Sequence, residues 1–303
     1  MKKGIFSDLS GQSKLGLLLL IIFISALIFS SIGLGVGYLV TGLSTKSNLL
    51  SDYTNSSTIT FLKISQIFQA LGIFVVPPLV AVFLFRKKNE NYLQFKISHY
   101  TYIILAGILM IISIPLNNWF AELNQSLILP DSWSGFETWM HNQENNAANI
   151  TKYFLKADNI GGLFTNLFIM AFLAAFGEEM LFRGVLQKLF TQISKNMHIA
   201  IFITAFIFSA IHMQFYTFLP RFFMGMVFGY LLVWTGSIWV PITAHFANNS
   251  FAVISNYLVQ QKVIETEMDN IDTESQYLYT LLSIILISSI LYYINKQTNL
   301  KLE

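Results

Sequence analysis

Long runs of apolar residues, separated by short polar segments, dominate the chain from residue 15 to residue 294. A run of about 20 apolar residues is long enough to cross the hydrocarbon core of a bilayer as a helix. The pattern predicts eight membrane spans, at 15–42, 64–85, 100–118, 161–182, 198–214, 217–235, 237–259 and 277–294. The period-two alternation of an outer-membrane barrel is not seen. The predicted fold class is therefore all-α, a polytopic transmembrane helical bundle of about eight spans.

Composition and charge favour the same class. Of the 303 residues, 54% are hydrophobic and only 11% are charged, against about 25% charged in an ordinary soluble domain. The net charge of +2 is too small to indicate a nucleic-acid partner, so membrane lipids are the expected surroundings. The chain has no cysteine, which excludes thiolate chemistry, cysteine-ligated metal and disulfides.

Basic residues gather on one predicted side of the membrane. With the N-terminus in the cytoplasm, eleven lysines and arginines fall in cytoplasmic segments and five in outer segments, as positive residues prefer. Both termini are therefore expected in the cytoplasm, and a bacterial cytoplasmic membrane is the expected location. The acidic loop 265–274 and the tryptophan-rich segment 119–160 then lie outside. Segment 119–160 is predicted to form interfacial helices, either as a plain connection or as a lid over a site.

Ionisable residues interrupt the fourth predicted span, which contains Glu178-Glu179-x-x-x-Arg183. Charges inside a membrane are costly unless they pair or line a wet cavity. On a helix, Glu179 and Arg183 are i,i+4 neighbours and can form an ion pair. Glu178 projects about 100° away, which leaves its carboxylate free to face a cavity as a general base. The alternative is that the span ends here and the charges lie at the membrane surface.

Two further polar pairs lie in later spans. Phe208-x-x-x-His212 places an aromatic ring one turn before a histidine, where the ring restricts the histidine rotamer. The alternative for this histidine is a plain helix–helix hydrogen bond. His245-x-x-x-Asn249 puts two hydrogen-bond donors on one helix face, as an oxyanion site requires. Asn248 is expected to point elsewhere.

Together, the Glu-Glu-x-x-x-Arg, the Phe-x-x-x-His on the next span and the His-x-x-x-Asn two spans later resemble the pattern of the CAAX-protease and bacteriocin-processing (CPBP) family. That family includes the type II CAAX prenyl endopeptidases. The resemblance covers roughly residues 160–255, and all three motifs are complete. It implies a helical bundle with its site in an intramembrane cavity. The implied activity is an intramembrane peptidase that cleaves a membrane-associated protein or peptide.

The resemblance also implies a set of catalytic residues. These are Glu178, Glu179, Arg183, His212, His245 and Asn249. By similarity to the family, Glu178 and His212 would bind and activate the water that attacks the scissile carbonyl. His245 and Asn249 would stabilise the tetrahedral oxyanion, and the ion pair would order the other side chains.

A peptidase without metal or other cofactor is the expected chemistry. The alternative is a zinc ion held by Glu178, His212 and His245, three ligands that leave a fourth position open for water. The chain lacks a His-Glu-x-x-His sequence, so a zinc site requires three helices to converge.

The expected depths of these side chains conflict. At 1.5 Å per residue, Glu178 lies roughly 8 Å and His245 roughly 10 Å from the cytoplasmic edge of the hydrocarbon, whereas His212 lies roughly 20 Å from it. Either the fifth span begins outside the bilayer and tilts, or its boundary near residue 198 is wrong.

Two other functions would use the same residues. A non-catalytic membrane immunity or scaffold protein would keep the fold, and a proton-coupled transporter would use the carboxylates and histidines as a relay. Transporters commonly show inverted repeats, which the sequence lacks. One integral membrane domain is expected. Its three parts are the N-terminal spans and outer segment at 1–160, the catalytic core spans at 161–259, and the acidic loop, last span and cytoplasmic tail at 260–303.

Overall fold

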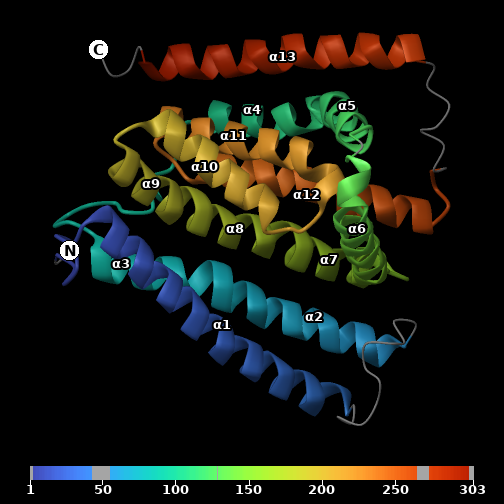
Figure 1. Cartoon of the computed structure of the whole chain (residues 1–303), viewed down its shortest axis with the longest axis horizontal. Helices are drawn as coiled ribbons and strands as arrows, with labels where there is room; N and C mark the ends of the chain where they lie inside the picture. The colour runs from blue at the N-terminus through green and yellow to red at the C-terminus, as the bar shows by residue number, and fades with distance from the viewer. Residues whose placement is uncertain (1–2, 43–54, 128, 265–272, 300–303) are drawn as a thin grey trace.

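The computed structural model of the protein describes residues 3–42, 55–127, 129–264 and 273–299. All regular elements within these ranges are helices, which confirms the all-α fold class (Figure 1). By length and composition, five of the described helices can cross a membrane, or six if one bent pair counts as a single span. The predicted count of about eight is not confirmed. The acidic loop falls almost wholly outside the described residues.

The first two predicted spans form an antiparallel helical hairpin along one side of the molecule (Figure 1). The second span is continuous but changes its winding at a π-helical turn, and Pro77 and Pro78 follow in the first turn of the next helix. Because proline lacks a backbone N–H, it interrupts the hydrogen-bond ladder of a continuous helix, in agreement with the change of winding just before it. The elements are α1 (Gly11–Thr41), α2 (Ser56–Ala70), η1 (Leu71–Val75) and α3 (Val76–Phe85).

The third predicted span is broken, and the segment 119–160 that follows contains helices, whereas its place at the outer membrane interface stays a prediction. Two helices meet at Ser113 with a bend of 46°. Pro115 lies in the first turn of the second helix. Sharp helix bends are commonly found at proline, so we attribute the bend to Pro115. The elements are α4 (Tyr100–Ile112), α5 (Ile114–Gln125), η2 (Asp131–Trp133) and α6 (Ser134–Leu155). The last helix, α13 (Thr273–Asn299), packs along this broken span, where Ser283 Oγ donates to the Ile112 carbonyl.

The fourth span is much longer than predicted. It runs from Ile160 to Ser194 through two π-helical stretches, and the charged cluster lies between and within them. The predicted end at residue 182 is therefore wrong. A π turn is wider than an α turn and is found mostly at functional sites. The elements are α7 (Ile160–Asn166), η3 (Leu167–Leu173), α8 (Ala174–Glu179), η4 (Met180–Leu186) and α9 (Gln187–Ser194).

Two of the predicted core spans, 198–214 and 237–259, correspond to helices that are too short or too polar to be counted as membrane-spanning by length and composition. α10 has only 14 residues, or about 21 Å of rise, against a hydrocarbon core of about 30 Å. α12 has 22 residues but carries several asparagines, which lower its hydropathy. The core elements are α10 (Met197–Ala210), η5 (Phe215–Thr217), α11 (Phe218–Thr235) and α12 (Trp239–Gln260).

The conflict between the depths of Glu178 and His212 is removed by these bounds, whereas His245 still lies only six residues after the start of α12. Because the long helix continues to Ser194, Glu178 lies sixteen residues before its end. His212 lies fifteen residues after the start of α10 at Met197. Both side chains are therefore about 20–24 Å from the turn that joins the two helices. The boundary near residue 198 was right, and the error lay in the end assigned to the fourth span.

Candidate active site

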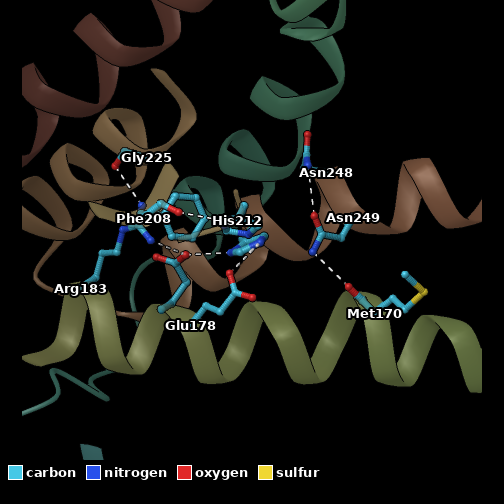
Figure 2. Close-up of polar contacts among 10 residues, drawn as sticks. Met170, Glu178, Arg183, Phe208, His212, Gly225, Asn248 and Asn249 are labelled. Atoms are coloured by element: carbon cyan, nitrogen blue, oxygen red, sulfur yellow. Dashed lines mark hydrogen bonds and ion pairs between the residues drawn. The ribbon is translucent and has the colours of Figure 1, made fainter. Parts of the chain in front are cut away.

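A cavity of about 360 Å³ lies among α6, α8, α11, α12 and the turn after α10. Four of the six predicted site residues line it. These are Glu178, His212, His245 and Asn249. The other two, Glu179 and Arg183, lie behind the cavity wall and are fully buried. Side chains from three separate stretches of the chain thus meet at one place (Figure 2).

Glu179 and Arg183 form the ion pair expected from their spacing. Arg183 Nη1 donates to Glu179 Oε1 at 2.9 Å, and Arg183 Nη2 donates to the Gly225 carbonyl of α11 at 3.0 Å (Figure 2). The guanidinium also lies 4.5 Å from the centre of the Phe208 ring, a favourable cation–π distance. Both charged side chains are at most 1% exposed. These charges are therefore inside the bundle, and the alternative that they mark a membrane surface is wrong.

His245 connects this ion pair to the cavity. Its Nδ1 lies 2.8 Å from Glu179 Oε1, the oxygen that also accepts from Arg183. A carboxylate paired with arginine is an acceptor, so Nδ1 carries the proton and donates. The other ring nitrogen, Nε2, lies 3.9 Å from Glu178 Oε2. The ring stacks on Phe228 with the centroids 5.3 Å apart, which fixes its plane.

His212 is oriented by its own motif. Its Nδ1 lies 2.7 Å from the Phe208 carbonyl oxygen, and the Phe208 ring meets it edge-on with the centroids 5.2 Å apart. A carbonyl can only accept, so Nδ1 carries the proton and the neutral ring has a free lone pair on Nε2. The bond is to the residue one turn earlier, which differs from the helix–helix bond considered as the alternative. α10 ends at Ala210, so His212 lies in the turn that follows.

Asn249 faces the cavity between α12 and the long helix. Its Nδ2 donates to the Met170 carbonyl at 3.1 Å, and its Oδ1 accepts from Asn248 Nδ2 at 3.2 Å (Figure 2). Asn248 itself lines the cavity. The expectation that Asn248 points elsewhere was therefore wrong. Asn248 is three residues after His245, so on a helix its side chain lies only about 60° around the axis from that of His245.

Glu178 is the least constrained carboxylate of the site. Its Oε2 is buried and has no hydrogen-bond partner among the described residues. Its nearest ionisable contact is His245 Nε2, at 3.9 Å. The π-helical stretch η4 begins two residues later and contains Arg183, which bonds to α11. Glu178 is thus a largely buried carboxylate that lines the cavity beside the His245 ring.

In the zinc alternative, His245 Nε2 and Glu178 Oε2 would both bind the ion; they lie 3.9 Å apart, against about 3.4 Å for two ligands of one tetrahedral zinc ion. The expected chemistry without metal stays a prediction. No group of three metal-ligating side chains is assembled within the described residues.

Two residues that line the cavity were not singled out in the sequence. Arg221, in the first turn of α11, and Gln214, in the turn before η5, both face it. An available signal was overlooked, because Arg221 is an arginine inside the predicted span 217–235 and such a charge needs a reason. Gln214 had no such signal, since a lone glutamine beside a turn is ordinary.

Known proteins resemble the part of the chain that holds this site. Residues 160–251 match the family model described as type II CAAX prenyl endopeptidase Rce1-like. The uncharacterized protein YpbD of Bacillus subtilis (strain 168) is 38% identical over 85 residues, and the alignment covers 27% of this chain and 40% of YpbD. No solved structure matches the chain. All three motifs and Arg221 lie inside the matched residues. Residues 160–251 are therefore an Rce1-like domain of the type II CAAX prenyl endopeptidase family.

Proposed function

We propose that this chain is an intramembrane endopeptidase that hydrolyses a peptide bond of a membrane-associated protein or peptide. The observation that carries the proposal is Glu178, whose carboxylate oxygen Oε2 is buried and has no hydrogen-bond partner among the described residues. It shares one cavity with His212 and His245, amid helices long and apolar enough to cross a membrane. The proposal keeps the predicted location, a bacterial cytoplasmic membrane with both termini in the cytoplasm.

Glu178 and His212 are proposed to activate the attacking water. The Glu178 carboxylate accepts one proton of the water while the free Nε2 of His212 accepts a hydrogen bond from the other. The water oxygen then bonds to the scissile carbonyl carbon, and the carbonyl oxygen becomes an oxyanion. When the intermediate collapses, the proton held by Glu178 passes to the leaving nitrogen as the C–N bond breaks. A carboxylic acid and a free amine result, and the acid then releases its proton to solvent as a carboxylate.

His245 and Asn249 are proposed to stabilise the oxyanion. Asn249 has two N–H groups, and only one of them is used by the Met170 carbonyl. His245 Nε2 faces the cavity and donates in the doubly protonated form of the ring. Glu179 holds the opposite edge of that ring, and Arg183 holds Glu179. Removing one oxyanion donor typically lowers the rate about 10²- to 10³-fold.

The test is cleavage of membrane-anchored peptides by the purified chain in lipid vesicles. We expect Glu178→Gln and His212→Ala to lower the rate by about 10²- to 10⁴-fold, the usual contribution of general acid–base catalysis. Asp131→Asn is the matched control, because Asp131 is an exposed carboxylate on η2 away from the cavity. Circular dichroism and thermal unfolding check that each variant is folded. Cleavage by Glu178→Gln at the wild-type rate contradicts the proposal.

A further inference from the structure

The cavity contains a second arginine that the proposed mechanism does not use. Arg221 Nη2 donates to Gln214 Oε1 at 2.7 Å and lies 3.4 Å from Thr217 Oγ1. Arg221 Nη1 is buried and has no hydrogen-bond partner among the described residues. The guanidinium is therefore held in place by neutral groups at one nitrogen, its other terminal nitrogen lacks a partner among the described residues, and the residue lines the cavity.

No carboxylate pairs with this guanidinium in the described part of the chain. Two carboxylates, Glu178 and Glu144, are near enough to act on it electrostatically. Glu144 Oε2 already accepts from the Tyr216 backbone N–H at 3.2 Å. Glu178 is needed as the proposed base, so neither is a dedicated partner. Arg183 differs, because it has both a carboxylate and a backbone carbonyl as partners.

A partly buried, unpaired cation is costly unless something compensates for it. The planar guanidinium is the side chain best suited to bind a carboxylate, often through two parallel hydrogen bonds. Gln214 and Thr217 hold the group before any ligand binds, so little freedom is lost when a carboxylate arrives. Arg221 lines the same cavity as Glu178, so a bound carboxylate would belong to the molecule undergoing cleavage.

We infer that Arg221, oriented by Gln214, is a carboxylate subsite that sets the specificity of this peptidase. The substrate then carries a carboxylate within a few residues of the scissile bond, either as its C-terminus or as an aspartate or glutamate side chain. This inference deepens the proposed function and rests on it. Arg221 touches the substrate without taking part in the proton transfers.

The experiment compares matched peptides with the full chain in vesicles of neutral lipid. One pair differs only in a free against an amidated C-terminus, and a second pair exchanges aspartate and glutamate for asparagine and glutamine. We expect the wild type to prefer the carboxylate member of at least one pair by about tenfold to a hundredfold in kcat/KM, the range for a charge-assisted hydrogen bond. The pair that shows the preference identifies the source of the carboxylate.

The variant Arg221→Gln is expected to remove that preference through KM. In this variant the two members of the pair should be cleaved with similar kcat/KM, because the group that distinguishes them is gone. Arg221→Lys keeps the positive charge but lacks the two parallel N–H donors of the guanidinium, so it should keep part of the preference. Lys63→Gln is the control, because Lys63 lines a different cavity beside α2. The inference is overturned if the wild type shows no preference in either pair, if Arg221→Gln keeps it, or if that variant loses both substrates equally.

Binding separates this inference from the proposed function. Fluorescent peptides are titrated into the Glu178→Gln protein with and without Arg221→Gln. Tighter binding of the carboxylate peptide that depends on Arg221 supports the subsite even if no peptide is cleaved. Cleavage without any Arg221-dependent preference supports the peptidase and overturns the subsite. A dependence on added anionic lipid, without peptide discrimination, also overturns it.

Discussion

The two sides of the cavity are built differently. One side, here called the α9 side, consists of three residues of the long helix: Glu179, Arg183 and Gln187. They follow one another at i, i+4 and i+8, and each bonds to a neighbouring helix. The carbonyls of Gly225 and Gly229 accept from the last two, because these glycines let α11 come close. On the side of α6, His212 and its neighbours lie in a turn rather than in a helix.

The difference concerns what remains available for a ligand. The α9 side also has buried polar atoms without hydrogen-bond partners among the described residues, namely Glu179 Oε2, Arg183 Nε and Gln187 Oε1. None of these three residues lines the cavity, so their polar atoms support His245 from behind the cavity wall. The α6 side leaves the Nε2 of His212 and the Nη1 of Arg221 without partners among the described residues. We therefore interpret the first side as the part that positions the chemistry and the second as the part that receives the substrate.

The largest effect on stability should come from the paired arginine. Arg183→Gln leaves the buried Glu179 without its cation, and breaking a buried ion pair costs about 3–5 kcal/mol. Arg221→Gln removes a cation that has no carboxylate partner, so we expect a change within about 1 kcal/mol. Unfolding in detergent micelles measures both. Equal losses in the two variants would mean that the two sides do not differ.

A smaller effect should come from the close helix contact that supports the α9 side. A methyl group at Gly229 would lie 2.8 Å from Ile201 Cγ2 and 2.9 Å from Gln187 Oε1. Overpacking of this kind costs about 1–3 kcal/mol. Gly35→Ala in α1 is the control, because the space around Gly35 is open. The same unfolding assay should show a loss for Gly229→Ala and none for the control.

The smallest effect should come from the pH dependence of an ion pair just beyond the α9 side. Burial raises the pKa of the Glu90 carboxyl, but hydrogen bonds from Lys188 and the Lys87 backbone outweigh it and lower the pKa below 4.5. The pair therefore stabilises the fold above pH about 4.5, and this contribution is lost as the pH falls through the lowered pKa. Both side chains are about a quarter exposed, so the contribution should stay below about 1 kcal/mol.

This third prediction is checked by unfolding at a series of pH values. Wild type should lose stability below pH about 4.5 relative to Glu90→Gln, whose side chain does not titrate. A difference between the two proteins that is constant over the acid range would show that the Glu90 charge plays no part.

Local spacing was enough to predict much of the site. One helical turn separates Glu179 from Arg183 and Phe208 from His212, and both pairs behave as the period of 3.6 requires. The sequence could also predict that charges within apolar runs belong to a cavity, because no other location in a membrane protein accepts them cheaply.

The rest depended on features that hydropathy does not report. The fourth span extends to Ser194 because π-helical winding and tertiary packing continue the helix past its charged residues. The apolar pattern alone placed its end near residue 182. The role of Asn248 depends on how α12 is rotated about its axis. Arg221 lies 43 residues after Glu178 in the sequence, so only the fold brings both to one cavity.

The central claim is that Glu178 enables this chain to cut membrane-associated polypeptides. The most direct test replaces Glu178 with glutamine in the chain's own gene and compares the membrane proteins and their termini with those of wild-type cells by mass spectrometry. The account predicts that at least one uncut polypeptide accumulates in the variant and that its fragment disappears. Identical sets of membrane proteins and termini in the two strains would contradict it.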